Sequence, residues 1–341
     1  MTKAGMGSWS LKANEFPQKG SFEAQAKYLL RYTVLAPSSH NSQPWRFRIG
    51  AQSVDILADR SRALPVVDPL DRELIISCGA ALATLEVAAQ HFGFDPQIVM
   101  APDPKNQDIL AHVRLPKGNK DTYGALLPAI LQRRTTRASF GPRTPSDAVM
   151  DACAHHAAQG GVYFSFFTDA DTRKAVAELV DAGDHLQFSN PAFRRELASW
   201  VHSVGAGARD GMSASGFGMP DVLAPVARFA LRRFDIGNGV AAGDVKKILN
   251  GTPMLALLST DADNTGAWLQ TGRALGLILL DLTAHGFTAS FLNQPIECVE
   301  LRPKLRDAVG AAGVPQILLR IGEATDKPSP SQRRALGDVL L

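Results

Sequence analysis

Two long apolar helical segments that share one pattern constrain this chain most. CGAALATLEVAAQHFGF (78–94) and TGRALGLILLDLTAHGF (271–287) align without a gap at an offset of 193 residues. The shared positions pair Gly79 with Gly272, Ala81 with Ala274, Leu82 with Leu275, Gly93 with Gly286 and Phe94 with Phe287. Such a repeat predicts two related α+β lobes in one chain, although helix composition alone can also produce five shared positions.

Hydrophobic periodicity and helix-end residues predict helices and strands in both halves. The first half is expected to hold helices at about 22–35 and 73–92 and strands within 46–58, 97–100 and 109–115. The second half is expected to hold strands at 162–168, 253–260 and 316–323 and helices at 125–132, from 144, from 168 to 183, 221–234 and 263–285. Capping boxes are predicted at Thr144–Asp147 and Thr168–Asp171. The predicted domains are 1–120 and 121–341, the second with an insertion at about 205–245.

Composition argues against several classes of partner. The 341 residues are 45% hydrophobic and 20% charged with a net charge of +3, and no Lys/Arg tract is interleaved with aromatic residues. We therefore expect no nucleic acid partner. The longest apolar stretch, ALGLILLDLTA, is too short to span a bilayer, and the N-terminus has no apolar signal core. We therefore expect no membrane partner and a cytoplasmic protein with three reduced, widely spaced cysteines.

Two polar segments carry the chemistry. APSSHNSQPW (36–45) places neutral hydrogen-bonding side chains and a tryptophan between an amphipathic run and an alternating run. In LQRRTTRASF (131–140), Arg133, Thr135 and Arg137 point to one side if the segment is extended. Guanidinium forks and a hydroxyl at this spacing suit a phosphate monoester, while a solvated basic turn is the alternative. QRRAL (332–336) offers a second basic pair with the same alternative.

These segments together resemble the nitroreductase family of FMN proteins. The family pattern R-x-S/T-x-R/K, followed by an aromatic residue, is similar to 133–137 with Phe140. The family pattern A-P-S-x-x-N-x-Q-P-W-x-F matches Ala36, Pro37, Ser38, Asn41, Gln43, Pro44, Trp45 and Phe47. The decapeptide precedes the basic motif here, which reverses the usual order. That order, the tail PSPSQRRALGDVL and FTASFLNQPIE resemble the Acg-type, twin-lobed branch of the family.

The resemblance implies an α+β fold of two nitroreductase-like lobes, with mixed or antiparallel sheets flanked by helices, fused to mimic a homodimer. Residues 1–20 contain no arginine, and the junction AAQGGVYF (157–164) contains no PSxxN. Each lobe thus keeps the half of a site that the other lacks. We expect one FMN between the lobes of each chain, and a monomer or an optional homodimer.

The resemblance also implies roles for single residues. The phosphate is expected to contact Arg133, Thr135, Arg334 and Arg333, and the ring edge Ser38, Ser39 and Asn41. Arg137, or less directly Lys247, is expected near N1 and O2 of the ring, and Ala289 and Ser290 near O4 and N5. Gln43 is either a cofactor contact or packing, Trp45 is expected in the core, and His40 is either a proton donor or a loop residue. No catalytic side chain and no metal ligand are expected.

Two functions follow from the resemblance. The first is an NAD(P)H-dependent oxidoreductase that reduces nitroaromatics or quinones by ping-pong hydride transfer, with NAD(P)H as a transient reductant and the flavin carrying the chemistry. The second is a non-catalytic protein that stores or shields FMN. The glycine-rich segment 209–244, with a predicted apolar helix, is the expected lid over the flavin in that case.

Overall fold

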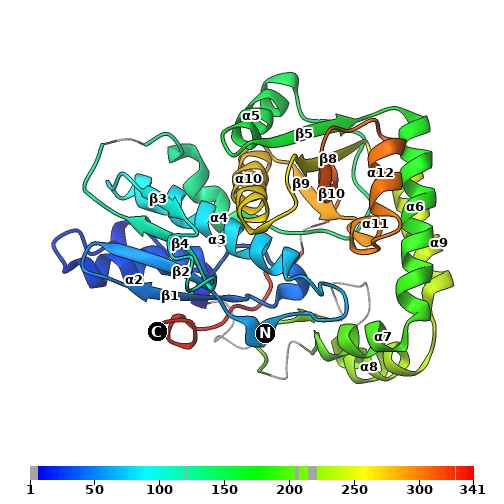
Figure 1. Ribbon diagram of the computed structural model, residues 1–341, viewed down its shortest axis with the longest axis horizontal. Helices are drawn as coiled ribbons and strands as arrows, with labels where there is room; N and C mark the ends of the chain where they lie inside the picture. The colour runs from blue at the N-terminus through cyan, green and yellow to red at the C-terminus, as the bar shows by residue number, and fades with distance from the viewer. Residues whose placement is uncertain (1–6, 120, 204–206, 214–220, 327) are drawn as a thin grey trace.

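Each half of the chain forms one four-stranded antiparallel sheet (Figure 1). The computed structural model describes residues 7–119, 121–203, 207–213, 221–326 and 328–341. The first sheet has the order β1 (Trp45–Ile49), β2 (Ser53–Ala58), β4 (Ile109–Arg114), β3 (Gln97–Met100). The second has the order β5 (Val162–Phe167), β8 (Met254–Thr260), β10 (Val314–Gly322), β9 (Thr288–Phe291). The α+β class predicted from the sequence is confirmed.

The two halves repeat one topology. In each, a long helix follows the second strand of the half: α3 (Arg72–His91) in the first and α10 (Thr265–Ala284) in the second. The two helices begin and end at the same offset of 193 residues that the sequence repeat showed. A helix of 12 residues precedes the first strand of each half, α2 (Phe22–Thr33) and α5 (Asp147–Ala158). The internal duplication is therefore real.

The helices α3 and α10 pack against each other with their backbones in contact. A Cβ atom at Gly272 would lie 2.0 Å from the Ile76 carbonyl oxygen, and one at Gly79 would lie 2.3 Å from the Leu269 carbonyl oxygen. Ile76 and Leu269 are themselves related by the repeat, so the contact is twofold symmetric. α3 has the length and composition of a membrane span, but 94% of its apolar window is buried, as in a core helix.

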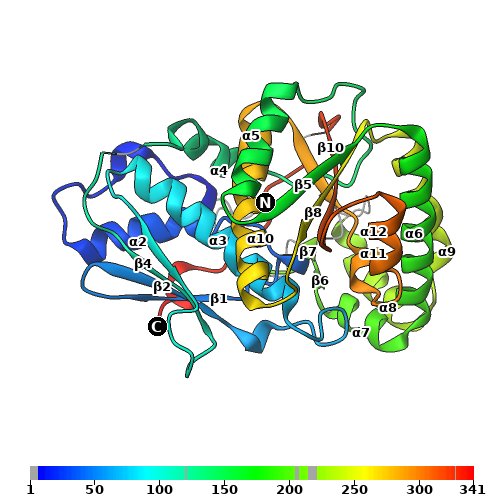
Figure 2. The same ribbon diagram turned by 45° about the horizontal axis from the view of Figure 1, so that its top comes forward.

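Helices cover both faces of the second sheet. Alternate residues of β8 point to opposite sides: Ala256 and Leu258 belong to the main core with α10, whereas Leu255 and Leu257 belong to a second core. The helices of the second core are α6 (Ala170–Ser189), α9 (Gly237–Asn250), α11 (Gln294–Glu297) and α12 (Arg302–Ala308) (Figure 2).

The expected insertion at 205–245 forms part of a helical extension between β5 and β8. Its remaining elements are α7 (Pro191–Ser199), the parallel pair β6 (Val201–His202) and β7 (Met212–Ser213), and α8 (Ala224–Arg233). α7 and α8 lie together beyond the ends of α6 and α9 (Figure 1). Residues 205–206 and 214–220 of the predicted lid lie outside the described residues.

The C-terminal tail returns to the first lobe. The Phe47 N–H donates to the Val339 carbonyl at 2.8 Å, and the Leu341 N–H donates to the Phe47 carbonyl at 2.9 Å. The tail therefore extends the first sheet beside β1, close to the site loop at residues 38–43. The sheet strands fall on either side of residue 120, but the tail crosses the predicted division at 120/121, which stays a prediction.

Two helix ends differ from the sequence prediction. α4 (Leu127–Gln132) lies where a helix was expected, but α5 begins at Asp147 with Ser146 as its N-cap, so the capping box at Thr144 is wrong. α6 is capped by Asp169, which accepts the Thr172 N–H at 2.7 Å, in place of Thr168.

The helix α6 also runs past its predicted end. It continues through Gly183 to Ser189. A Cβ atom at Gly183 would lie 2.8 Å from Cβ of Gln294 in α11. The glycine is therefore needed for close packing between helices rather than for ending α6.

Substituting Gly272→Ala should separate the two central helices. The added methyl group meets backbone atoms of α3, so the unfolding free energy should fall by about 1–3 kcal/mol. Gly266→Ala is the matched control in the same helix, because the nearest atom to its Cβ is an Asn264 side-chain oxygen at 3.5 Å. The control should gain up to about 1 kcal/mol from helix propensity. Urea unfolding of both variants tests the contact, and equal stability would contradict it.

Candidate functional site

The loop 38–43 has an unusual backbone. His40, Asn41 and Gln43 all have positive φ angles, of 51°, 53° and 52°. Such conformations cost non-glycine residues free energy and concentrate at functional sites. The Ser38 hydroxyl accepts the Gln43 N–H at 2.9 Å and closes the loop. The structure therefore holds this segment in a shape that its residues would not adopt alone.

Asn41 ties the loop to two distant parts of the chain. Its side-chain N–H donates to the Gly211 carbonyl at 3.0 Å and to the Gln332 carbonyl at 3.1 Å. Its side-chain oxygen accepts from the Arg333 guanidinium at 2.9 Å. The expected ring contact from the first lobe and one member of the expected tail pair are thus in direct contact.

The side chains of Gln43 and Arg334 are both held by hydrogen bonds within the protein. The Gln43 amide is fully buried; it donates to the Arg209 carbonyl at 2.9 Å and accepts the Arg334 N–H at 2.8 Å. The Arg334 guanidinium donates to the Gln43 carbonyl at 3.1 Å and pairs with Asp59 at 3.2 Å. These contacts give both side chains a role in holding the loop. Trp45 is fully buried in the core, as expected.

Ser39 faces the central helix α3. Its hydroxyl donates to the Glu73 carboxylate, and its N–H donates to the Ser77 hydroxyl at 3.3 Å. Glu73 also accepts from the Asn293 side chain at 2.9 Å and from the Arg72 guanidinium at 2.9 Å. Ser39 is therefore placed by a buried polar network that joins the two lobes.

Three arginines gather beside the loop. Arg133 and Arg333 are only 6% and 4% exposed. Burial lowers the pKa of Arg133 to about 10, with Arg134 adding to the effect. Burial also lowers the pKa of Arg333, and the charges of Arg133 and Arg134 lower it further. The guanidinium groups of Arg134 and Arg333 lie 4.5 and 5.0 Å from the Trp9 ring centre.

This arginine cluster (Arg133, Arg134 and Arg333) is not balanced by carboxylates. In the described part of the chain, no ion pair is formed by any of the three. The Arg133 guanidinium does reach the Thr135 hydroxyl, at 3.4 Å. Buried like charges without counter-ions are costly. The cluster therefore has the electrostatics of an anion site.

The segment 133–137 also contacts β9 of its own lobe. Thr135 pairs with Ala289 of β9 in a parallel bridge. The neighbouring Ser290 hydroxyl accepts from the Arg320 guanidinium at 3.1 Å. Arg320 is 2% exposed, its Nε–H has no partner among the described residues, and burial lowers its pKa to about 10. Thr135, Ala289 and Ser290 are therefore brought together, with a further buried cation that the sequence did not single out.

Arg137 is the last of the expected site arginines in the segment 133–137. Its guanidinium donates to the Met212 sulfur at 3.4 Å. Burial lowers the pKa of His40 to about 4; Glu73 opposes this shift, and the charge of Arg137 adds to it. Arg137 therefore acts electrostatically on His40 of the loop, and its expected position near the flavin ring stays a prediction. Lys247, the weaker alternative, pairs with Asp244 at 2.9 Å.

Two signals for the missed residues are visible in the sequence. Arg320 is a charged residue in the middle of the apolar strand QILLRIG. Such a residue inside a buried strand calls for a partner or a ligand. Trp9 precedes the first helix, in the segment 1–20 that contains no arginine.

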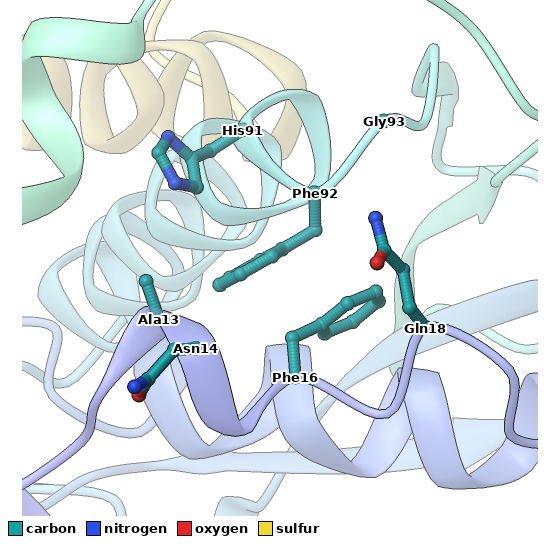
Figure 3. Close-up of a pocket in the computed structure, with 7 residues that line it drawn as sticks. All are labelled: Ala13, Asn14, Phe16, Gln18, His91, Phe92 and Gly93. Carbon is teal, nitrogen blue, oxygen red and sulfur yellow. The ribbon is translucent and has the colours of Figure 1, made fainter.

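A separate hollow lies at the end of α3 and holds no arginine cluster. Its volume is about 380 Å³, and the Phe16 and Phe92 rings stack there with centroids 4.3 Å apart (Figure 3). The lining residues are Ala13, Asn14, Phe16, Gln18, His91, Phe92 and Gly93. The hollow lacks the expected phosphate ligands and is not the candidate site.

The geometry of the described residues defines a class of protein: a duplicated α+β chain with one buried cationic site where its lobes meet. No family model matches the chain. The NAD(P)H nitroreductase Rv3131 of Mycobacterium tuberculosis is 33% identical over 318 residues, which cover 92% of this chain and 90% of that protein. The chain therefore belongs to the NAD(P)H nitroreductase family.

Further relatives have the same span. The nitroreductase Acg of M. tuberculosis is 28% identical and covers 92% of this chain, with 94% of its own length matched. The nitroreductase PigM of a Serratia strain is 24% identical, with 94% of each chain covered. Among solved structures, the FMN- and NADPH-dependent nitroreductase NfnB of Sphigopyxis sp. strain HMH aligns with a TM-score of 0.43, at 17% identity over 63% of this chain and 96% of that chain.

An acidic pair lies near the cations. The Gln294 side chain donates to Asp184 at 3.2 Å and to Asp244 at 3.2 Å. Burial raises the pKa of Asp184 to about 7, and the charge of Asp244 adds to this. Asp184 is therefore protonated in the folded protein over a pH range in which it is ionised in the unfolded chain.

The stability should consequently depend on pH through Asp184. Below about pH 4 the carboxyl is protonated in both states. As pH rises from about 4 to 7 only the unfolded chain loses the proton, so stability falls by up to about 1.4 kcal/mol per pH unit. Asp184→Asn should remove this part of the decline, whereas Glu178→Gln, at an exposed position of the same helix, should not. Urea unfolding from pH 4 to 8 tests it, and parallel pH profiles for the wild type and Asp184→Asn would contradict it.

Proposed function

We propose that this chain binds one FMN between its lobes and acts as an FMN-dependent NAD(P)H oxidoreductase. The arginine cluster is the single observation that carries the proposal. A phosphate monoester bears nearly two negative charges and acceptor oxygens, which match the fork of Arg133, the Nε–H of Arg333 and the Thr135 hydroxyl. Its binding would offset the buried positive charge.

The ring edge would lie against the loop 38–43 and the β9 segment. The positive φ angles at His40 and Asn41 turn backbone groups of the loop away from an ordinary strand or helix pattern. The His40 Nδ1 atom is buried without a partner among the described residues. Because its pKa is lowered to about 4, the imidazole is neutral near pH 7. It would then contribute a hydrogen bond rather than a charge.

The bound flavin supplies the hydride chemistry, and the chain supplies electrostatics and orientation. Arg137 would stabilise negative charge at N1 and O2, and Arg320, held by Ser290, would do so at the O4 side. Arg320 would act the more strongly because it is buried and little water screens it, whereas Arg137 is exposed. Both arginines would therefore make the ring a better electron acceptor.

The reductant and acceptor follow from the family. Relatives carry the name NAD(P)H nitroreductase, and the NfnB of M. smegmatis was solved in complex with NADPH, with a TM-score of 0.40, at 15% identity over 64% of this chain and 97% of that chain. We propose NAD(P)H as the electron donor and small nitroaromatic or quinone-like molecules as acceptors, reduced in a ping-pong cycle. The proposal includes a cytoplasmic location, where NAD(P)H is available, and a site that one chain completes without a second copy.

One contact set favours the alternative function. Residues 209–212 lie against the loop: Gly211 bonds to Asn41, Arg209 to Gln43, and Met212 to Arg137. A segment in this position would cover the flavin and restrict access to it. A non-catalytic protein that stores or shields FMN is therefore the second proposal.

Flavin content and anaerobic reduction separate these proposals. The purified protein should contain about one FMN per chain, because the described part of the chain has one buried arginine cluster beside one such loop. Mixing it with NADPH without oxygen should bleach the flavin absorbance if the chain is an oxidoreductase. Bleaching by dithionite but not by NADPH or NADH would favour the storage protein. Two FMN per chain, or FAD, would contradict the single site.

Arginine substitutions should separate the effect on FMN affinity from the effect on the reduction potential of the flavin. Arg133→Gln should weaken FMN binding about ten- to a hundredfold by loss of a charged hydrogen bond, with little change in reduction potential. Arg137→Gln should lower the potential as well as the affinity. Arg114→Gln, on the exposed end of β4, is the control and should change neither. Fluorescence titration of released FMN and dye-equilibrated potentials measure the two effects; unchanged affinity in Arg133→Gln would contradict a phosphate site at 133–137.

A further inference from the structure

The helix α8 presents its larger apolar side chains to solvent. Its buried residues are Ala224, Ala227 and Leu231, at helical spacing. Val226 and Phe229 lie on other faces and are 63% and 58% exposed. A helix that only served the core would place valine and phenylalanine inward and alanine outward. The outer face of α8 is therefore apolar for a reason other than folding.

The exposed apolar surface continues on both sides of α8. Six of the fifteen large apolar side chains exposed in the described part of the chain lie within residues 222–236. Besides Val226 and Phe229, they are Val222 at 82%, Leu223 at 45%, Phe234 at 57% and Ile236 at 37%. A concentration of this kind marks an interaction surface.

Four arginines surround the same face. Arg195, Arg228, Arg232 and Arg233 line a cavity of about 540 Å³ together with Pro225 and Phe229. Within the described residues, none of the four side chains forms a hydrogen bond or an ion pair.

The nearby carboxylates do not neutralise these arginines. Glu196 accepts the Val66 and Val67 N–H groups, each at 2.9 Å. Asp235 accepts the Gly237 N–H at 2.8 Å. The surface thus combines net positive charge with exposed apolar side chains.

We propose that this α8 surface, residues 222–236 with Arg195, docks on an anionic lipid bilayer. A bilayer accepts valine and phenylalanine side chains at its acyl boundary while the arginines meet lipid phosphates just above it. Apolar side chains and arginines alternate on one short helix, α8, which lies at the edge of the molecule (Figure 1). This arrangement suits a bilayer, where lipid phosphates lie above an apolar layer. The sequence predicted no membrane partner because its longest apolar stretch is too short to span a bilayer, and docking on a surface needs no spanning segment.

The docking surface is joined to the candidate site through a short path. α8 packs against β6, which pairs with β7, and the β7 region contacts Asn41 and Arg137. Docking would hold the site near the bilayer, where apolar quinone-like acceptors dissolve. The docking itself does not depend on flavin binding, so a failure of the flavin proposal leaves it testable.

Vesicle co-sedimentation of the full chain tests the proposal. The protein should sediment with vesicles of phosphatidylcholine and phosphatidylglycerol in equal parts, and not with phosphatidylcholine alone. Each arginine removed should lower the partition coefficient about fivefold; Arg228→Gln with Arg232→Gln should lower it about twenty-five-fold. Arg48→Gln with Arg114→Gln removes the same charge elsewhere and is the matched control. An equal loss in the control pair would overturn the proposal.

Insertion of the apolar side chains needs its own readout. In a Phe229→Trp variant, the spectral shift of the new tryptophan on adding vesicles, measured against the wild type, should be to the blue and should occur only with anionic lipid. Inorganic phosphate at millimolar concentration should not release the protein, because it cannot replace the apolar contact. Release by phosphate would make the face a free-anion site and overturn docking. A concentration-dependent dimer abolished by Phe229→Ser, without vesicle binding, would assign the face to a second copy instead.

Discussion

The backbone contact between α3 and α10 is the constraint on which the other parts depend. At Gly79 and Gly272 each helix occupies the space that a side chain of the other would need. The contact is symmetric under the internal repeat, so the two sheets are arranged around it with equivalent strand order. The loop 38–43 and the segment 133–137 belong to different halves. Their approach therefore depends on how closely these two helices pack.

The symmetry of the backbone is not a symmetry of charge. The segment before α5 carries Arg133, Arg134 and Arg137, whereas the segment before α2 contributes Trp9, over which Arg134 and Arg333 lie. The first lobe thus supports the cations of the second in place of building its own cluster. In the described residues, a duplicated frame with one buried set of cations would give a fold with two equivalent halves one candidate anion site.

The sequence was sufficient where local signals are strong, and insufficient where tertiary contacts decide. α3 and α10 were predictable because they are long, apolar and end before glycine. The end of α6 was not, since Gly183 packs against Gln294 instead of ending the helix. The motifs indicated Arg133 and Asn41. The sequence could not predict which of the two tail arginines lies beside them. The backbone pairing of Phe47 with Val339 turns Arg333 inward, and Arg334 forms an ion pair with Asp59 instead.

The contacts between the loop 38–43 and Arg333 offset only part of the strain in the loop and only part of the cost of burying Arg333. Positive φ angles at three non-glycine residues cost of the order of 1–3 kcal/mol each. Arg333 offsets part of this by donating to the Leu35 and Ala36 carbonyls and to Asn41. Yet its Nε–H has no partner in the described structure, and its charge adds to that of Arg133. A fold that accepts both strain and unbalanced charge in one place has given up stability there, and a bound anion with acceptor oxygens is what would restore it.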